Sequence, residues 1–181
     1  MIENSKKEKD DLLIYLVQTY GKSVKKFAYT YVKDWTLTED IAQDVFMNCY
    51  HHLDNFRNEA SYKTWIFTIT ANKSKDVLKS SWFKQLFRIG DKEPLNKSSS
   101  AEELYLAKNA EEQVVQSVMT LPIKYREVII LYYYEDMKIK EMQELLRVNE
   151  NTIKTRLSRA KGLIRKKLER SGLEWRTSSN S

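Results

Sequence analysis

The stretch 138–170 constrains the fold more than any other, because its apolar residues recur at helical spacing in two runs separated by a short turn. The first run consists of Ile139, Met142, Leu145 and Leu146. The second run forms one stripe along a helix and consists of Ile153, Leu157, Ala160, Ile164 and Leu168. Asn149 is expected to cap the second helix, and Arg147 stands in the turn, where glycine would adopt a left-handed backbone more easily. The stretch predicts a helix-turn-helix, whose second helix can enter the DNA major groove.

The other side of the second helix carries small polar and basic side chains. They are Asn151, Thr155, Ser158, Arg159 and Lys166, with Lys154, Arg156, Lys161, Arg165, Lys167 and Arg170 on the flanks. Small polar groups can approach base edges while Lys and Arg neutralise phosphates. The alternative is a solvated basic helix at the end of a helical bundle, because Lys and Arg runs usually only face water. The small polar residues between the basic ones favour DNA binding.

Composition agrees with a helical protein that binds a polyanion. Only 4 Gly and 2 Pro occur among 181 residues, which argues against a β-rich fold with many tight turns. The net charge of +6 and a pI near 9.2 suit a polyanionic partner. A single Cys cannot form an internal disulfide, which fits a reducing cytoplasm. The sequence shows neither an apolar signal region nor a run of about 20 apolar residues, so we expect a soluble intracellular protein.

The N-terminal part predicts three helices. The first spans 11–33, with Gly21 as a candidate break point; Thr38 is predicted to cap the second, and Ser61 the third, which runs over 62–80. Inward-facing positions of the second helix are predicted to be Ile41, Ala42, Val45, Phe46 and Cys49. Those of the third are Trp65, Ile66 and Ile69. The places of Phe56 and Tyr62, in and beside the loop before the third helix, are left open between core and exposed function.

The remainder predicts a linker and a second helical unit. The polar residues of 81–108 predict a flexible linker, whose apolar start WFKQLF can dock onto a neighbour or a partner. Residues 101–119 are predicted to be helical, Pro122 to lie in the first turn of the next helix, and 128–134 to be a buried helix despite its strand propensity. The fold class is therefore all-α, with two small helical domains joined by a flexible linker and the helix-turn-helix in the C-terminal one. The predicted domains are 1–80 and 109–175, and 176–181 is predicted to be a disordered tail.

The sequence predicts no catalytic site, cofactor or metal. Cys49, His51 and His52 are close in sequence, but neighbouring histidines on a helix point about 100° apart, and the chain has no further Cys or His to complete a site. There is no Gly-rich phosphate loop and no nucleophile–His arrangement with supportable spacing. We therefore expect no enzymatic activity.

Three stretches, in order, resemble parts of bacterial sigma factors. Residues 37–50 (LTEDIAQDVFMNCY) resemble the polymerase-binding helix, and residues 56–79 (FRNEASYKTWIFTITANKSKDVLK) resemble the helix that melts and recognises the −10 element. Residues 121–168 resemble the −35-binding domain, including TIKTR and SRA. Together with the length, the two helical domains and the short linker, they match the extracytoplasmic-function group of the sigma-70 family. The resemblance covers almost all of residues 11–170.

The resemblance implies a function for each part of the chain. Domain 1–80 would bind core RNA polymerase through Glu39, Asp40, Gln43 and Asp44. It would engage the −10 element through Phe56, Arg57, Asn58, Tyr62, Trp65, Asn72, Lys75 and Lys79. Domain 109–175 would read the −35 element through Asn151, Thr152, Lys154, Thr155, Arg156, Ser158, Arg159 and Lys161. The implied partners are core RNA polymerase, promoter DNA and an anti-sigma factor, often membrane-anchored, with the chain itself in the cytoplasm.

Two other classes of protein would also carry a basic helix-turn-helix. A free-standing regulator would bind an operator as a dimer, and would bind duplex DNA tightly without polymerase. An adaptor would place the basic helix on an acidic partner and show no DNA sequence preference. A free-standing regulator would explain neither the acidic EDIAQD helix nor the aromatic loop.

Overall fold

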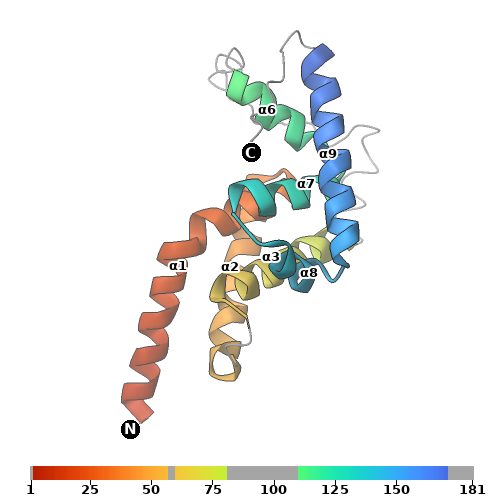
Figure 1. The fold of residues 1–181 in the computed structure, drawn as a ribbon. Helices are drawn as coiled ribbons and strands as arrows, with labels where there is room; N and C mark the ends of the chain where they lie inside the picture. The colour runs from red at the N-terminus through yellow and green to blue at the C-terminus, as the bar shows by residue number, and fades with distance from the viewer. Residues whose placement is uncertain (1, 57–59, 81–109, 171–181) are drawn as a thin grey trace.

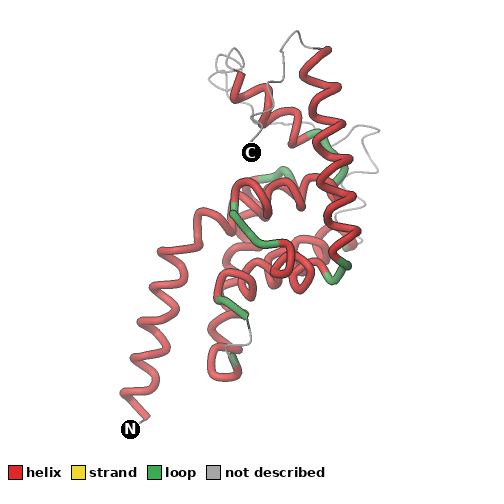
Figure 2. Tube along the Cα trace, in the orientation of Figure 1, coloured by secondary structure: helices red, strands yellow, loops and turns green. Residues whose placement is uncertain are grey.

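Helices make up most of the part of the chain that this computed structural model describes, residues 2–56, 60–80 and 110–170 (Figure 1). The elements are α1 (Ile2–Val32), α2 (Trp35–His52), η1 (Leu53–Asn55), α3 (Tyr62–Lys79), α6 (Ala110–Met119), α7 (Ile123–Ile129), η2 (Ile130–Tyr134), α8 (Ile139–Leu146) and α9 (Glu150–Arg170). Figure 2 shows helices and loops, and no strand, in these residues. The predicted all-α class is therefore confirmed. The predicted linker, the start of the 101–119 helix, the C-terminal tail, Arg57 and Asn58 lie outside the described residues.

Helices α1, α2 and α3 pack into one group around a shared core. α1 runs unbroken through Gly21, although it changes direction partway along (Figure 1). Fully buried Phe27 lies 5.2 Å from Phe67 of α3, measured between ring centroids. The predicted inward face of α2 is confirmed for Ile41, Ala42, Val45 and Cys49, while Phe46 is half-buried. In α3 the predicted Ile66 is fully buried, whereas Trp65 and Ile69 are half-buried against the core.

The cap of α3 follows the prediction and the cap of α2 does not. Ser61 Oγ accepts a hydrogen bond from the Thr64 backbone N–H at 3.1 Å. At α2, Thr38 is wrong as the cap: Asp34 caps the helix, its Oδ1 accepting from the Leu37 N–H at 2.9 Å. Lys33 has a left-handed backbone (φ 53°), so the chain turns there and α2 begins one turn earlier than expected. Thr38 is instead fully buried within the helix.

The helix-turn-helix is confirmed as α8, a turn and α9. Arg147 adopts the left-handed conformation (φ 53°, ψ 44°) that the turn requires, at a steric cost that glycine would avoid. Asn149 Oδ1 accepts from the Thr152 N–H at 2.8 Å and so caps α9. All five residues of the predicted stripe, Ile153, Leu157, Ala160, Ile164 and Leu168, are buried. Because this stripe is buried, the opposite face of α9 points away from the core.

The segment 128–134 is helical as predicted but is buried only in part. α7 passes into the wider turns of η2, where the Glu135 N–H donates to the Ile130 carbonyl, five residues back, at 3.0 Å. Leu131 is fully buried, whereas Tyr132, Tyr133 and Tyr134 are exposed, so the expectation of a wholly buried helix is wrong. Tyrosine side chains can occupy this exposed side because their hydroxyl groups can hydrogen-bond to water. Pro122 lies at the N-cap of α7, one position before the predicted first turn.

The C-terminal helices pack against the first group. α3 contacts α8, and α1 contacts α7, so the two groups lie directly against each other. The buried Arg126 of α7 donates to the backbone carbonyl of Thr30 in α1, and at 2.6 Å to that of Leu121. The two predicted helical units are therefore in direct contact with each other in this structure.

Candidate functional site

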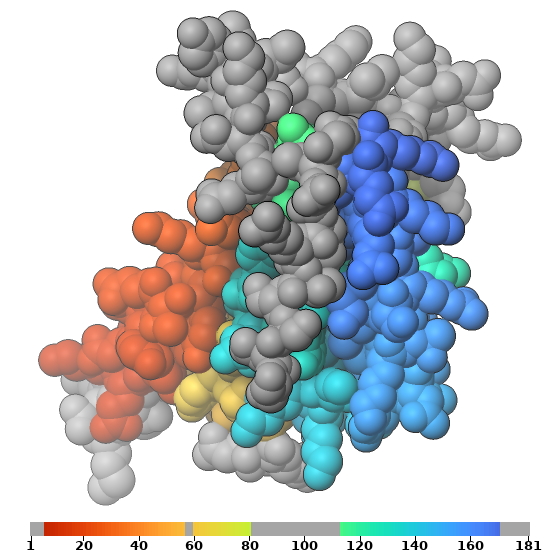
Figure 3. All heavy atoms as spheres, turned by 45° about the horizontal axis from the view of Figure 1, so that its top comes forward, coloured from red at the N-terminus to blue at the C-terminus, as the bar shows by residue number. Residues whose placement is uncertain are grey.

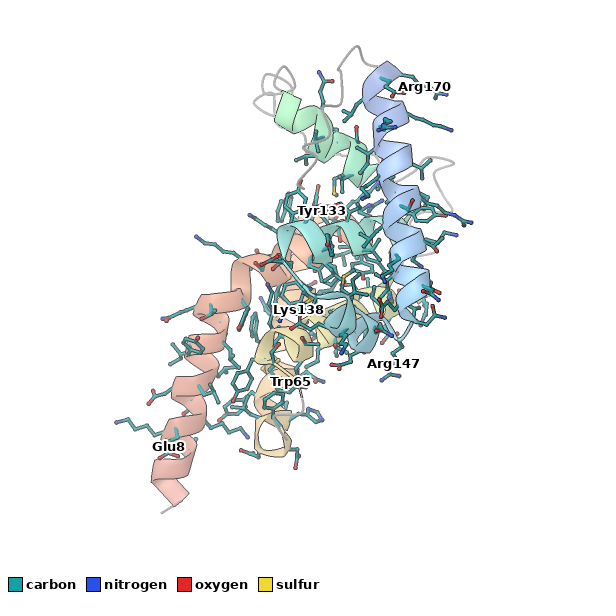
Figure 4. All side chains as sticks on the ribbon, viewed as in Figure 1. Glu8, Trp65, Tyr133, Lys138, Arg147 and Arg170 are labelled. Atoms are coloured by element: carbon teal, nitrogen blue, oxygen red, sulfur yellow. The ribbon has the colours of Figure 1, made fainter. Side chains whose placement is uncertain are left out.

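The outer side of α9 presents the side chains that the sequence assigns to DNA. Figure 3 shows α9, in blue, along one edge of the molecule. Figure 4 labels Arg147, in the turn just before α9, and Arg170, the last residue of α9. The exposed members of the predicted set are Asn151, Lys154, Thr155, Ser158, Arg159 and Lys161, while Thr152 and Arg156 are half-buried. The structure therefore brings small polar and basic groups together on one helix face, as major-groove recognition requires.

Two basic residues of this surface already have acidic partners. Lys154 Nζ lies 2.5 Å from a carboxylate oxygen of Glu150, one turn earlier, and this pair lowers the pKa of Glu150. Arg156 lies 3.2 Å from Glu127 of α7, whose side chain is only 4% exposed. Exposed pairs contribute little, so Lys154 stays available to DNA, whereas Arg156 is held by its ion pair with the buried Glu127.

The residues predicted to engage the −10 element include a cluster of three aromatic rings. The Phe56 ring lies 4.6 Å from that of Tyr62 in a stacked arrangement and 4.8 Å from that of Trp65, measured between centroids. All three side chains are half-buried, which answers the question that the sequence left open for Phe56 and Tyr62. The cluster lies at the start of α3, where Figure 4 labels Trp65. Such rings offer a surface on which unpaired bases can stack.

The polar residues predicted for the −10 surface do not all lie together. Asn72 and Lys79 are exposed on α3, and Lys79 lies 3.6 Å from the Asp76 carboxylate. Lys75 instead turns to the contact between the helix groups, where its Nζ lies 3.0 Å from Glu127. The predicted role of Lys75 on the DNA backbone is therefore not supported by its position in this arrangement.

The acidic residues predicted to bind polymerase are exposed on α2. Glu39 pairs with Lys25 of α1 at 2.7 Å, and Asp44 lies 3.4 Å from Lys73 of α3. Asp40 and Gln43 are exposed beside them. Surface pairs of this kind contribute about 0–1 kcal/mol, so they hold the acidic side chains only weakly. The carboxylates of α2 can therefore leave these lysines and pair with a basic surface of a partner.

Sequence reasoning missed Glu127 as the centre of a buried polar network. Its carboxylate accepts a hydrogen bond from the Tyr31 hydroxyl at 2.8 Å and pairs with Lys75 and Arg156. Burial, and next the Glu127 charge, raise the pKa of Tyr31 well above its ordinary value, so this hydroxyl remains a donor at neutral pH. The sequence did contain a sign of this network, because Arg126 and Glu127 stand side by side within the mainly apolar segment 121–134. Charged side chains inside a buried helix need partners.

The Cys–His stretch of α2 does not come together as a ligand set. Cys49 is fully buried, and burial raises the pKa of its thiol to about 12, so it stays protonated and binds metal poorly. His51 and His52 are exposed. Within the described residues there is no group of three or more side chains able to hold a metal ion. The helices described here also include none long and apolar enough to cross a membrane.

Two family models match the chain in the order that the sequence predicts. Sigma-70 region 2 matches residues 16–84 and Sigma-70 region 4 matches residues 111–164, and together they cover more than half of the chain. The sigma factor SigV of Bacillus subtilis is 28% identical over 162 residues, covering 90% of this chain and 94% of SigV. The ECF sigma factor SigW of Bacillus subtilis is 27% identical and covers 92% of this chain and 94% of SigW.

Solved structures of two further proteins share the fold. The sigma factor RpoE, in its complex with the anti-sigma factor NepR from Bartonella quintana, superposes with a TM-score of 0.68 at 20% identity, covering 88% of this chain and 97% of RpoE. CnrH, in complex with the cytosolic domain of CnrY, superposes with a TM-score of 0.66 at 24% identity and covers 89% and 90% of the two chains. At these identities the match concerns the arrangement of the helices.

Proposed function

The chain belongs to the extracytoplasmic-function group of the bacterial sigma-70 family, and from this membership we propose which surfaces direct core RNA polymerase to promoters. The observation that carries the proposal is the order of the two matches: region 2 ends before the exposed polar and basic face of α9, which lies in the region 4 match. We place polymerase binding and −10 melting in domain 1–80 and −35 recognition in domain 109–175, with 81–108 as the linker. The protein acts by binding and not by catalysis, in the cytoplasm.

The acidic face of α2 is the polymerase-binding surface of the proposal. Its carboxylates are exposed and only weakly held by their own lysines, so a basic surface of polymerase can replace those lysines. Complementary charge mainly speeds and orients such docking. The aromatic cluster at the start of α3 then offers its rings to bases that leave the −10 duplex.

Reversing charge on the acidic face tests the first contact. The double variant Asp40→Lys/Asp44→Lys is expected to weaken binding to core polymerase by about 10- to 100-fold, because like charges then face each other. The control Asp11→Lys/Glu144→Lys makes the same change in net charge at exposed positions on α1 and α8. Affinity is measured by fluorescence anisotropy with labelled protein. Equal losses in the two variants would remove the specific role of α2.

Truncating the α9 surface tests the second contact. Thr155→Ala and Arg159→Ala are each expected to weaken binding of the holoenzyme to its promoter by about 1–3 kcal/mol and to relax −35 preference. Affinity for core polymerase should stay unchanged, because α9 is not its proposed surface. Glu169→Ala, near the far end of α9, is the control and should leave both affinities unchanged. Normal transcription by the Thr155 and Arg159 variants would show that α9 does not read this element.

Reconstituted transcription tests the proposal as a whole. Purified chain and core polymerase, mixed with a promoter-containing template, are expected to produce specific run-off transcripts that neither component produces alone. A dimeric regulator would instead bind duplex DNA tightly without polymerase and give no transcripts. An adaptor would give neither transcripts nor sequence preference.

An anti-sigma factor is the third proposed partner. RpoE and CnrH, which share the fold, were each solved in complex with another protein, NepR and CnrY. We propose that a protein of that class restrains this chain until it is needed.

A further inference from the structure

A shallow hollow lies beside the exposed face of α9, and α7 forms its second wall. Lys124 and Tyr125, in the first turn of α7, line it together with Asn151, Thr155 and Arg159 of α9. Helices α7 and α9 pack directly against each other, so this neighbourhood is fixed by the core beneath it. Pro122 at the N-cap sets where α7 begins, and hence which residues reach the hollow. The sequence assigned neither Lys124 nor Tyr125 to any contact.

Tyr125 contacts the arginine that the sequence assigned to base recognition. Its ring is half-buried against the core, and both Tyr125 and Arg159 line the hollow. A hydrogen bond from Arg159 is the largest cause of a lowered pKa of the Tyr125 hydroxyl, followed, among the causes that lower it, by the charge of Lys124. The exposed Lys124 also places its Nζ 5.1 Å from the centroid of the Tyr125 ring. Two cations therefore meet one tyrosine whose ring is held by the core.

An anchored tyrosine changes what a long arginine side chain can do. A free arginine loses rotamer freedom when it binds, which opposes the interaction. A guanidinium already held by a hydroxyl keeps its remaining N–H groups pointing in a defined direction, and bidentate recognition of a guanine edge depends on that direction. Lys124, on the α7 wall of the hollow, is suited to a contact with a DNA phosphate rather than with a base.

We propose that Tyr125 is a positioning residue that orients Arg159 toward the base edges of the −35 element, and that Lys124 adds a phosphate contact from α7. The proposal rests on the function assigned to α9 above. It extends the DNA surface from one helix to two and makes specificity at one base pair depend on a residue that touches no base.

Loss of the hydroxyl alone tests the positioning role. A duplex library randomised over the −35 element is first selected for binding to the wild-type holoenzyme. The affinities of single-base variants of the most enriched sequence are then compared. Tyr125→Phe keeps the ring and is expected to reduce discrimination about three- to tenfold at the base pair where Arg159→Ala also reduces it, and at no other. The double variant should lose no more than Arg159→Ala alone, because the tyrosine acts through the arginine. Tyr133→Phe, at an exposed tyrosine of η2, is the matched control.

Lys124 is tested by its salt dependence. Lys124→Ala is expected to weaken holoenzyme binding to every −35 variant by the same factor, and to reduce the slope of log affinity against log salt by about 1. A sequence-dependent effect, or an unchanged slope, would overturn this part of the proposal.

The docking of α9 on DNA and the positioning role of Tyr125 can be disproved separately. If Arg159→Ala leaves discrimination unchanged at every base pair, the docking of α9 is wrong and the role of Tyr125 falls with it. If Arg159→Ala reduces discrimination and Tyr125→Phe does not, only the positioning role is overturned. Unfolding midpoints of all variants, measured by circular dichroism, show whether any loss reflects a damaged fold.

Discussion

Glu127→Gln is expected to lower the free energy of unfolding by about 2–4 kcal/mol, because hydrogen bonds to charged groups contribute about 1.5–3 kcal/mol each. The variant keeps the size of the side chain and an acceptor for the Tyr31 hydroxyl, but removes the charge that faces Lys75 and Arg156. Both cations are partly exposed, at 35% and 23%, so water offsets some of the loss. In a protein of this size, urea or thermal unfolding resolves such a change readily.

The same variant should loosen the contact between the helix groups. Glu127 of α7 bonds to Tyr31 of α1 and Lys75 of α3, so two of its three partners belong to the other group. Fluorophores on Met47→Cys of α2 and Lys161→Cys of α9, both exposed sites, should move apart when Glu127 is replaced. The native Cys49 is buried and should react slowly with the labels.

A double-mutant cycle separates this contact from general damage. Glu127→Gln and Lys75→Met together should destabilise less than the sum of the two single changes, with a coupling of about 0.5–3 kcal/mol. Glu144→Gln, at an exposed glutamate of α8, should change stability by less than about 0.5 kcal/mol. Zero coupling, with unchanged label separation, would show that Glu127 does not hold the groups together.

The Glu127 network also shows why part of the site escaped sequence reasoning. Tyr31 and Glu127 are 96 residues apart, and no local pattern reports which buried carboxylate a given lysine will meet. Lys75 and Arg156 were assigned to DNA because each lies among basic and polar neighbours on its helix, and that pattern carries no information about a partner on another helix. Their sequence neighbours Asn72 and Arg159 are exposed, as a contact with DNA would require.

Local interactions, by contrast, were predicted well. The stripe of α9, the Asn149 and Ser61 caps and the strained turn at Arg147 each depend on residues within a few positions of one another. The cap of α2 was misplaced because both Asp34 and Thr38 have side chains suited to capping, and the choice depended on where α1 ended. Tyr132–Tyr134 were predicted as buried because a helical pattern alone does not reveal the widened turns of η2.

The largest expected loss of stability comes from truncating the centre of the N-terminal core. Phe27→Ala should cost about 3–5 kcal/mol, since it removes a fully buried ring and leaves a cavity. The ring also meets Tyr31 edge-on at 5.3 Å and Phe67 at 5.2 Å, and such aromatic pairs contribute beyond the area they bury. For a domain of about 150–250 residues, the unfolding midpoint should fall by about 6–20 °C.

This loss of stability should also weaken binding to core polymerase, because Phe27 lies where α1, α2 and α3 pack together. The acidic face on α2 and the aromatic cluster at α3 both depend on that packing, so binding to core polymerase should fall near the new midpoint and recover on cooling. Met47→Ala, at a side chain 60% exposed on α2, removes a large apolar group outside the core and should change stability by less than about 0.5 kcal/mol. If the two variants unfolded at the same temperature, burial at Phe27 would not be what holds the polymerase-binding helices in place.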